Sequence, residues 1–80
     1  MAMATDIHTA ADGLVVSDLS ILGGKPVFCG TRLPVQSLFD YLADGLSLDY
    51  FLETFPSVTR EHAAAVLRYG WQRIEHELAA

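Results

Sequence analysis

Two of the five basic residues in this chain, Lys25 and Arg32, stand within the short segment 23–35. The same segment holds three glycines and two prolines. Glycine allows backbone conformations that other residues resist, and proline fixes its own φ and extends the residue before it. The two cations are therefore presented on stiff, bent backbone. Such a cation is suited to meeting an anion, such as a phosphate or the carboxylates of a partner.

Each cation also has a plainer interpretation. Arg32 can serve architecture instead, by bridging the loop to the following helix through main-chain carbonyls, and the flanking Gly30 and Pro34 favour this interpretation. Lys25 can be a simple loop cation. A phosphate loop is rejected, because the G-x-x-x-x-G-K-[ST] spacing is absent and a proline follows the lysine.

No group of residues has the spacing of an active site or a metal site. Cys29 has no second cysteine and no histidine near it in sequence, so we expect a packed side chain. His8, His62 and His76 do not share a metal-binding spacing. The acidic residues form no compact cluster for general acid–base chemistry. We expect a protein that is not an enzyme and that binds no metal and no cofactor.

The composition favours self-association or an obligate partner. Hydrophobic residues make up 51% of the 80 residues and charged residues only 19%. A small domain has little interior in which to hide apolar surface, although alanine inflates the percentage. Trp71, Ile74 and Leu78 share one face of the last predicted helix, so we expect this face to be a dimer or partner interface. A two-fold homodimer is the commonest solution.

The net charge and the single cysteine limit the ligands and the cellular compartment that the sequence is compatible with. A net charge of −5 argues against strong nonspecific DNA binding, although it allows a local basic patch. One cysteine excludes an intrachain disulfide and fits a reducing cytoplasm. Residues 1–11 lack the pattern of a signal peptide, and no apolar stretch is long enough to cross a membrane.

The hydrophobic pattern divides the chain into three parts. Residues 1–12 show no period and should form a flexible tail. Residues 13–80 should form a single domain, with an extended arm over 13–33 that contains two short β-prone stretches. The helical core should cover 34–80, where apolar residues recur at i, i+3, i+4 and i+7.

Four residues mark the expected helix boundaries. Pro34 suits a first helical position, and Gly45 should end the first helix. Ser47 should cap the second helix, and Thr59 should cap the third. The joints between the three helices are short, as in a helix-turn-helix domain. We therefore expect a mainly α fold, with a three-helix, homeodomain-like core and a short β-like N-terminal arm.

In such a fold the third helix is the natural reader of DNA. Its candidate contacts are Thr59, Arg60 and His62 at its start, and Arg68 two turns later. Arg60 and Arg68 lie near one another on the helical wheel and away from the apolar stripe. The alternative is a plain three-helix bundle with solvated arginines.

Three motifs in order give this chain a family resemblance. The run GGKPVFCGTRLPV at 23–35 is followed by LADGLS at 42–47 and FPSVT at 55–59. This series resembles the small bacterial family called domain of unknown function 433, over Ile21 to about Tyr69. Leu33 stands where isoleucine is usual, and residues 48–50 are less acidic than usual. Members are generally described as VapB-like antitoxins that resemble DNA-binding three-helix domains and are often encoded beside a PIN-like nuclease toxin.

The resemblance implies a non-enzymatic, antitoxin-like regulator that binds a PIN-like toxin and, as a dimer, operator DNA. PIN-type nucleases hold metal ions with clustered carboxylates, so a basic antitoxin residue placed there would block the site. Lys25 and Arg32 are the candidates for this contact. The alternative function is a protein–protein interaction module with a helix-turn-helix-like fold and no DNA binding, which the acidic composition favours.

Overall fold

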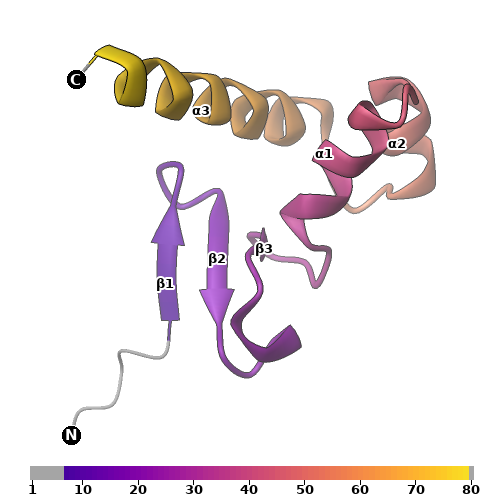
Figure 1. Cartoon of the computed structure of the whole chain (residues 1–80). Coiled ribbons are helices and arrows are strands. Elements are labelled where there is room, and N and C mark those ends of the chain that lie inside the picture. Colours follow the sequence, from indigo (N-terminus) through magenta and orange to yellow (C-terminus); the bar gives the residue numbers. More distant parts are fainter. Residues whose placement is uncertain (1–6, 80) are drawn as a thin grey trace, which may run out of the picture.

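A computed structural model of the protein describes residues 7–79, which form a three-stranded sheet and three helices (Figure 1). The sheet is antiparallel, with strand order β1-β2-β3. The elements are β1 (Ile7–Ala10), β2 (Val15–Asp18), the short 3-10 turn η2 (Leu22–Gly24), β3 (Val27–Phe28), α1 (Val35–Ala43), α2 (Leu48–Thr54) and α3 (Arg60–Ala79).

The expectation of a mainly α, homeodomain-like fold with a short β-like arm is wrong, because the N-terminal third forms a complete small sheet. Strand β1 occupies part of the predicted tail and pairs with β2 from Ile7–Asp18 to Ala10–Val15. The sequence of β1, Ile-His-Thr-Ala, does not alternate apolar and polar residues, so the pattern did not reveal it. The rest of the predicted tail, residues 1–6, lies outside the described residues.

The turn between β1 and β2 has an unusual backbone. Ala11 and Asp12 adopt positive φ angles of 54° and 57°, and Gly13 follows at 85°. The Gly13 N–H donates to the Ala10 carbonyl oxygen and the Leu14 N–H donates to the Ala11 carbonyl oxygen, both at 3.1 Å, so two overlapping turns reverse the chain. Ala11 is also buried, so the turn is held against the rest of the protein as well as by its own hydrogen bonds.

Strand β3 joins the sheet to the helices. Val27 and Phe28 are both fully buried, and Val27 also forms a bridge with Pro34 at the entry to α1. Phe28 belongs to one hydrophobic cluster with residues of all three helices. The buried members of this cluster are Phe28, Leu38, Phe51, Val58, Ala63 and Val66. The sheet and the helices therefore share a core.

The predicted helix boundaries are confirmed to within one residue. Pro34 is the N-cap of α1 and not its first residue, and Gly45 has the positive φ of 87° expected after a helix end. The Ser47 hydroxyl accepts the Tyr50 N–H at 3.0 Å. The Thr59 hydroxyl accepts the His62 N–H at 3.1 Å.

Helix α3 has two different halves. Its first half supplies Ala63 and Val66 to the core, whereas every residue from 71 to 79 is exposed. Figure 1 shows α3 running across the tip of the β1–β2 hairpin and continuing beyond it. In the part of the chain that the structure describes, no helix combines the length and the apolar character needed to cross a membrane.

Candidate functional site

The Gly-Thr-Arg segment forms a tight turn directly after β3. The Thr31 N–H and the Thr31 hydroxyl both donate to the Phe28 carbonyl oxygen, at 3.0 and 2.8 Å. The same hydroxyl accepts the Leu33 N–H at 3.0 Å. Gly30 supplies the positive φ of 82° that the third position of a type II turn requires. Thr31 and Gly30 therefore hold the shape of this turn.

Arg32 stands on this turn with its side chain exposed. Within residues 7–79 its guanidinium makes no hydrogen bond and no ion pair. The link from the loop to α1 is made by the main chain instead, where the Val35 N–H donates to the Pro26 carbonyl oxygen at 3.0 Å. The structure therefore contains the architectural bridge that we considered for Arg32, but Arg32 is not the residue that makes it.

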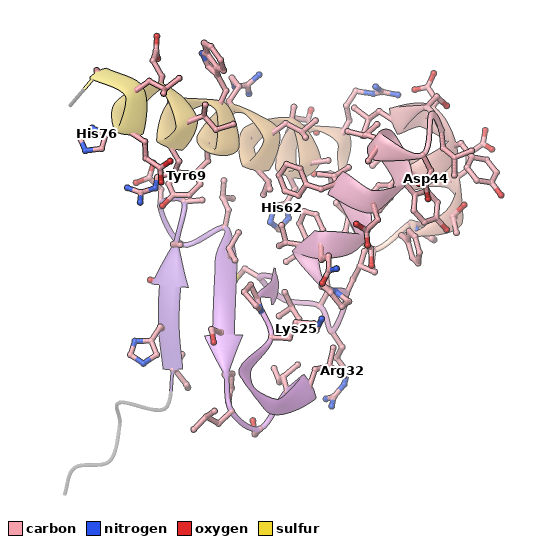
Figure 2. All side chains as sticks on the ribbon, viewed as in Figure 1. Lys25, Arg32, Asp44, His62, Tyr69 and His76 are labelled. Carbon is pink, nitrogen blue, oxygen red and sulfur yellow. The ribbon has the colours of Figure 1, made fainter. Side chains whose placement is uncertain are left out.

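Lys25 lies beside a groove between η2 and the start of α1. Its Nζ donates to the Gln36 side-chain oxygen at 3.0 Å, so the ammonium is steered toward α1. The groove measures about 650 Å³ and is lined by Leu22, Gly23, Gly24, Lys25, Pro26, Val35 and Gln36. Figure 2 shows Lys25 and Arg32 at the end of the molecule away from α3.

The groove combines apolar walls with one cation. An adjoining hollow of about 490 Å³ is lined by Leu22, Lys25, Pro34, Gln36, Ser37 and Asp40. Asp40 is the one carboxylate among these lining residues, and it lies one helical turn after Gln36. This surface can therefore hold an extended or bulky segment of a partner while Lys25 meets an acidic group.

The predicted DNA-contacting residues at the start of α3 have different roles in the structure. Thr59 uses its hydroxyl as the helix cap. Arg60 pairs with Asp49 of α2, and both side chains are exposed. An exposed ion pair contributes little to stability, so Arg60 can leave Asp49 at low cost.

The half-buried side chain of His62 points toward the sheet. Its Nε2 lies 2.8 Å from the Leu14 carbonyl oxygen. Its ring packs against Phe28 in a T-shaped arrangement, with a centroid distance of 5.2 Å. Figure 2 shows the imidazole on the side of α3 that faces the sheet. The side chain therefore joins α3 to the sheet, and its predicted contact with DNA stays a prediction.

Arg68 is exposed and lies near the β1–β2 turn. It lines a cavity of about 190 Å³ with Ala11, Asp12, Leu14, Ala65, Tyr69 and Gln72. Arg68 therefore borders the hairpin, whereas Arg60 faces α2. Arg60 and Arg68 thus have different neighbouring elements, and their contact with DNA stays a prediction.

Trp71, Ile74 and Leu78 are exposed by 60%, 53% and 84%. They lie in the part of α3 where every residue from 71 to 79 is exposed, and their role as an interface stays a prediction. Cys29 differs from expectation, because it is exposed at the turn and not packed. Its side chain leaves the core because it occupies the second position of the turn, where the chain reverses.

Three segments meet at the Leu14 carbonyl oxygen, a contact that the sequence did not predict. The Leu14 carbonyl oxygen accepts the Cys29 N–H at 2.8 Å as well as facing His62. The position of His62 three residues after the cap Thr59 gave no sign of this contact. Among residues 7–79, no three histidine, cysteine or acidic side chains lie together in a way that could hold a metal ion.

Comparison with known proteins places these features in a family. The family model described as "Protein of unknown function (DUF433)" matches residues 15–70. A protein of Sinorhizobium fredii named "Uncharacterized protein y4eO" is 44% identical over 56 residues, which cover 70% of this chain and 25% of that protein. The chain thus spans about a quarter of the length of this curated relative. No solved structure matches this chain significantly. Because the match includes β2, β3, the Gly-Thr-Arg turn and the buried half of α3, this chain belongs to the DUF433 family.

Proposed function

We propose that this protein is an antitoxin-like, non-enzymatic regulator that binds an acidic site on a partner protein through Lys25 and Arg32. The observation that carries the proposal is that the Arg32 side chain is exposed and unpaired within residues 7–79. Its turn is held by Thr31 and Gly30, and its guanidinium is exposed without a hydrogen bond or ion pair inside residues 7–79. A cation that the fold positions but does not use is available to a partner.

A PIN-like nuclease toxin fits this chemistry. Such a nuclease presents clustered carboxylates, and a guanidinium can bind a carboxylate through two parallel hydrogen bonds. The resemblance of the Gly-Gly-Lys-Pro and Gly-Thr-Arg motifs to antitoxin-like relatives supports this class of partner. Lys25 would hold the partner at the groove beside α1, while Arg32 would meet its carboxylates. The proposal assigns the protein no catalysis and no cofactor, and it places the protein in the cytoplasm.

The test uses the product of the adjacent gene. Co-expression with this chain should relieve any growth arrest that the neighbour causes, and purified chain should inhibit its nuclease activity. Arg32→Ala should weaken binding at least about tenfold, because the partner's carboxylates would lose a charged hydrogen-bond donor. Arg32→Lys should recover only part of this loss, since an ammonium lacks the planar fork.

Arg73→Ala is the matched control, because Arg73 is another exposed arginine, far along α3. It should bind as the parent chain does. If Arg32→Ala and Arg73→Ala bind equally well, Arg32 is not the contact. If the neighbour neither arrests growth nor binds this chain, the antitoxin function is excluded for this gene pair.

Operator DNA is the second candidate ligand, because Thr59 and Arg60 are exposed at the start of a helix that follows a short joint. The net charge of −5 and the pairing of Arg60 with Asp49 weigh against this function. A gel shift with the upstream region of its own gene, at stated salt, tests it. Arg60→Ala and Arg68→Ala should each weaken binding and lower the salt slope by roughly one unit. Binding that neither substitution changes would exclude α3 as the reader.

A further inference from the structure

The exposed apolar face of α3 has the spacing of a coiled-coil seam. Leu67, Trp71, Ile74 and Leu78 are separated by four, three and four residues. This is the alternation that places side chains along one side of a helix for pairing with another helix. Leu67 packs partly against the core, whereas the other three are 53–84% exposed. The seam therefore begins at the core and runs out along the free half of α3.

Helix α1 widens this face. Two ring carbons of Phe39 lie 3.5 and 3.6 Å from the position that a Cβ would occupy at Gly70. The Phe39 ring therefore lies against α3 at Gly70, and Phe39 itself is 41% exposed. Phe39 and the seam together form an open apolar surface on two elements, which we call the α3 seam surface.

We propose that a second copy of this chain covers the α3 seam surface, with the two α3 helices antiparallel about a two-fold axis. In this register, Trp71 packs beside Ile74 of the partner subunit. Leu67 packs beside Leu78 of the partner subunit. The two-fold axis repeats each of these two contacts, so the interface has four layers of paired side chains. Each subunit gives the same patch, as a two-fold interface requires.

The charges beside the seam favour a second copy of the chain as the partner and favour the antiparallel direction of the two helices. Arg68 and Glu75 each directly follow a seam residue, so they lie on the same flank of the seam. In an antiparallel pair, residues on this flank face each other. Arg68 then lies opposite Glu75 of the partner subunit, and the two-fold axis repeats the pair. The chain is thus charge-complementary to itself.

A parallel pair lacks this complementarity. Residues on the Arg68 flank would then face the opposite flank of the other helix, which carries Ala63, Gly70 and Glu77. In that arrangement Arg68 faces Ala63 of the partner subunit, and Glu75 faces Gly70 of the partner subunit. Trp71 would also have to stack against its own copy. The dimer does not depend on the proposed function, because Lys25 and Arg32 lie away from α3 (Figure 2).

Sedimentation of the full chain at micromolar concentration tests for the dimer. The parent chain should have the mass of two copies. Ile74→Glu should give monomers, because it puts two carboxylates into the seam, while the circular dichroism of the fold persists because Ile74 is outside the core. Arg73→Glu, which makes a charge change on α3 outside the seam, should remain dimeric. A parent chain that sediments as a monomer overturns the proposal, as does an Ile74→Glu variant that remains dimeric.

A charge exchange tests the register. Arg68→Glu alone places glutamates opposite glutamates, and Glu75→Arg alone places arginines opposite arginines, so each variant should dimerise at least about tenfold more weakly. The double variant R68E/E75R should recover. An equal mixture of the two single variants should form a 1:1 heterodimer, because both of its pairs are complementary. If the single variants dimerise like the parent chain, or if the mixture shows no preference, the antiparallel register is wrong.

Discussion

The imidazole of His62 in α3 lies 2.8 Å from the carbonyl oxygen of Leu14, which directly precedes β2. The same oxygen accepts the N–H of Cys29, so the helix, the sheet and the Gly-Thr-Arg turn meet at one acceptor. For His62 to donate to a carbonyl, its Nε2 must carry the proton. This contact fixes how the proposed binding turn is oriented relative to α3.

The two contributions of His62 can be separated by substitution. His62→Phe keeps an aromatic ring against Phe28 but removes the donor to Leu14. His62→Gln keeps a donor but removes the ring. Each should lower the free energy of unfolding by about 1 kcal/mol, as expected for one hydrogen bond or one aromatic pair. His62→Ala should cost more than either. Urea unfolding at fixed protein concentration measures the series. If His62→Ala leaves the free energy of unfolding unchanged, the contact does not stabilise the fold.

Thr31 should be the stabilising residue of the Gly-Thr-Arg turn. Thr31→Val keeps the shape of the side chain but removes both hydrogen bonds of its hydroxyl, so we expect a loss of about 1–2 kcal/mol in unfolding free energy. Arg32→Ala should change stability by less than about 0.5 kcal/mol, because its side chain is exposed. Equal losses in the two variants, measured by urea unfolding, would mean that Arg32 also supports the turn.

Gly70→Ala should stabilise the protein. Gly70 lies inside α3, where alanine is favoured over glycine by about 1 kcal/mol. The new Cβ would lie 3.5 Å from Phe39, which is ordinary van der Waals contact. Thermal unfolding should show a higher midpoint. A lower midpoint would show that Phe39 needs the space that glycine leaves, and sedimentation of the variant would reveal any change in association.

Asp18, at the end of β2, should have a shifted titration. The side-chain hydroxyl and then the main-chain N–H of Ser20 donate to its carboxylate and lower the pKa of Asp18 from 3.8. A lowered pKa in the folded state adds stability above pH 3.8, and this contribution is lost as the pH falls through the folded pKa. Ser20→Ala should move the pKa of Asp18 back toward its ordinary value. Carboxyl NMR titration measures this shift, and an unchanged titration would exclude the hydroxyl as its cause.

The sequence predicted the helices better than the sheet, for physical reasons. The caps Ser47 and Thr59 act over three residues, so local sequence is sufficient to identify them. Strand β1 has four residues, all exposed, and its partner choice depends on a turn in which Ala11 takes a positive φ. Alanine rarely adopts a positive φ, so an alanine in the sequence does not predict such a turn. The mistaken fold class follows from this one missed strand.

The candidate site was predicted unevenly for a related reason. Arg32 and Trp71 face outward, and the constrained loop and the helical period were enough to single them out. The sequence predicts His62 at the surface because its two contacts, Leu14 and Phe28, are 48 and 34 positions away in sequence. Contacts of that range depend on how the sheet and the helices come together, which no local pattern specifies.

The family match ends at residue 70, and the buried half of α3 ends at the same point. Residues 71–79 therefore contribute to recognition under our proposal without contributing to the shared core. Changes in this short stretch can alter which chains pair while leaving the folding unit intact. Several relatives that carry the same domain could then coexist in one cell without forming mixed assemblies, provided that their α3 ends differ in seam residues or in flanking charge.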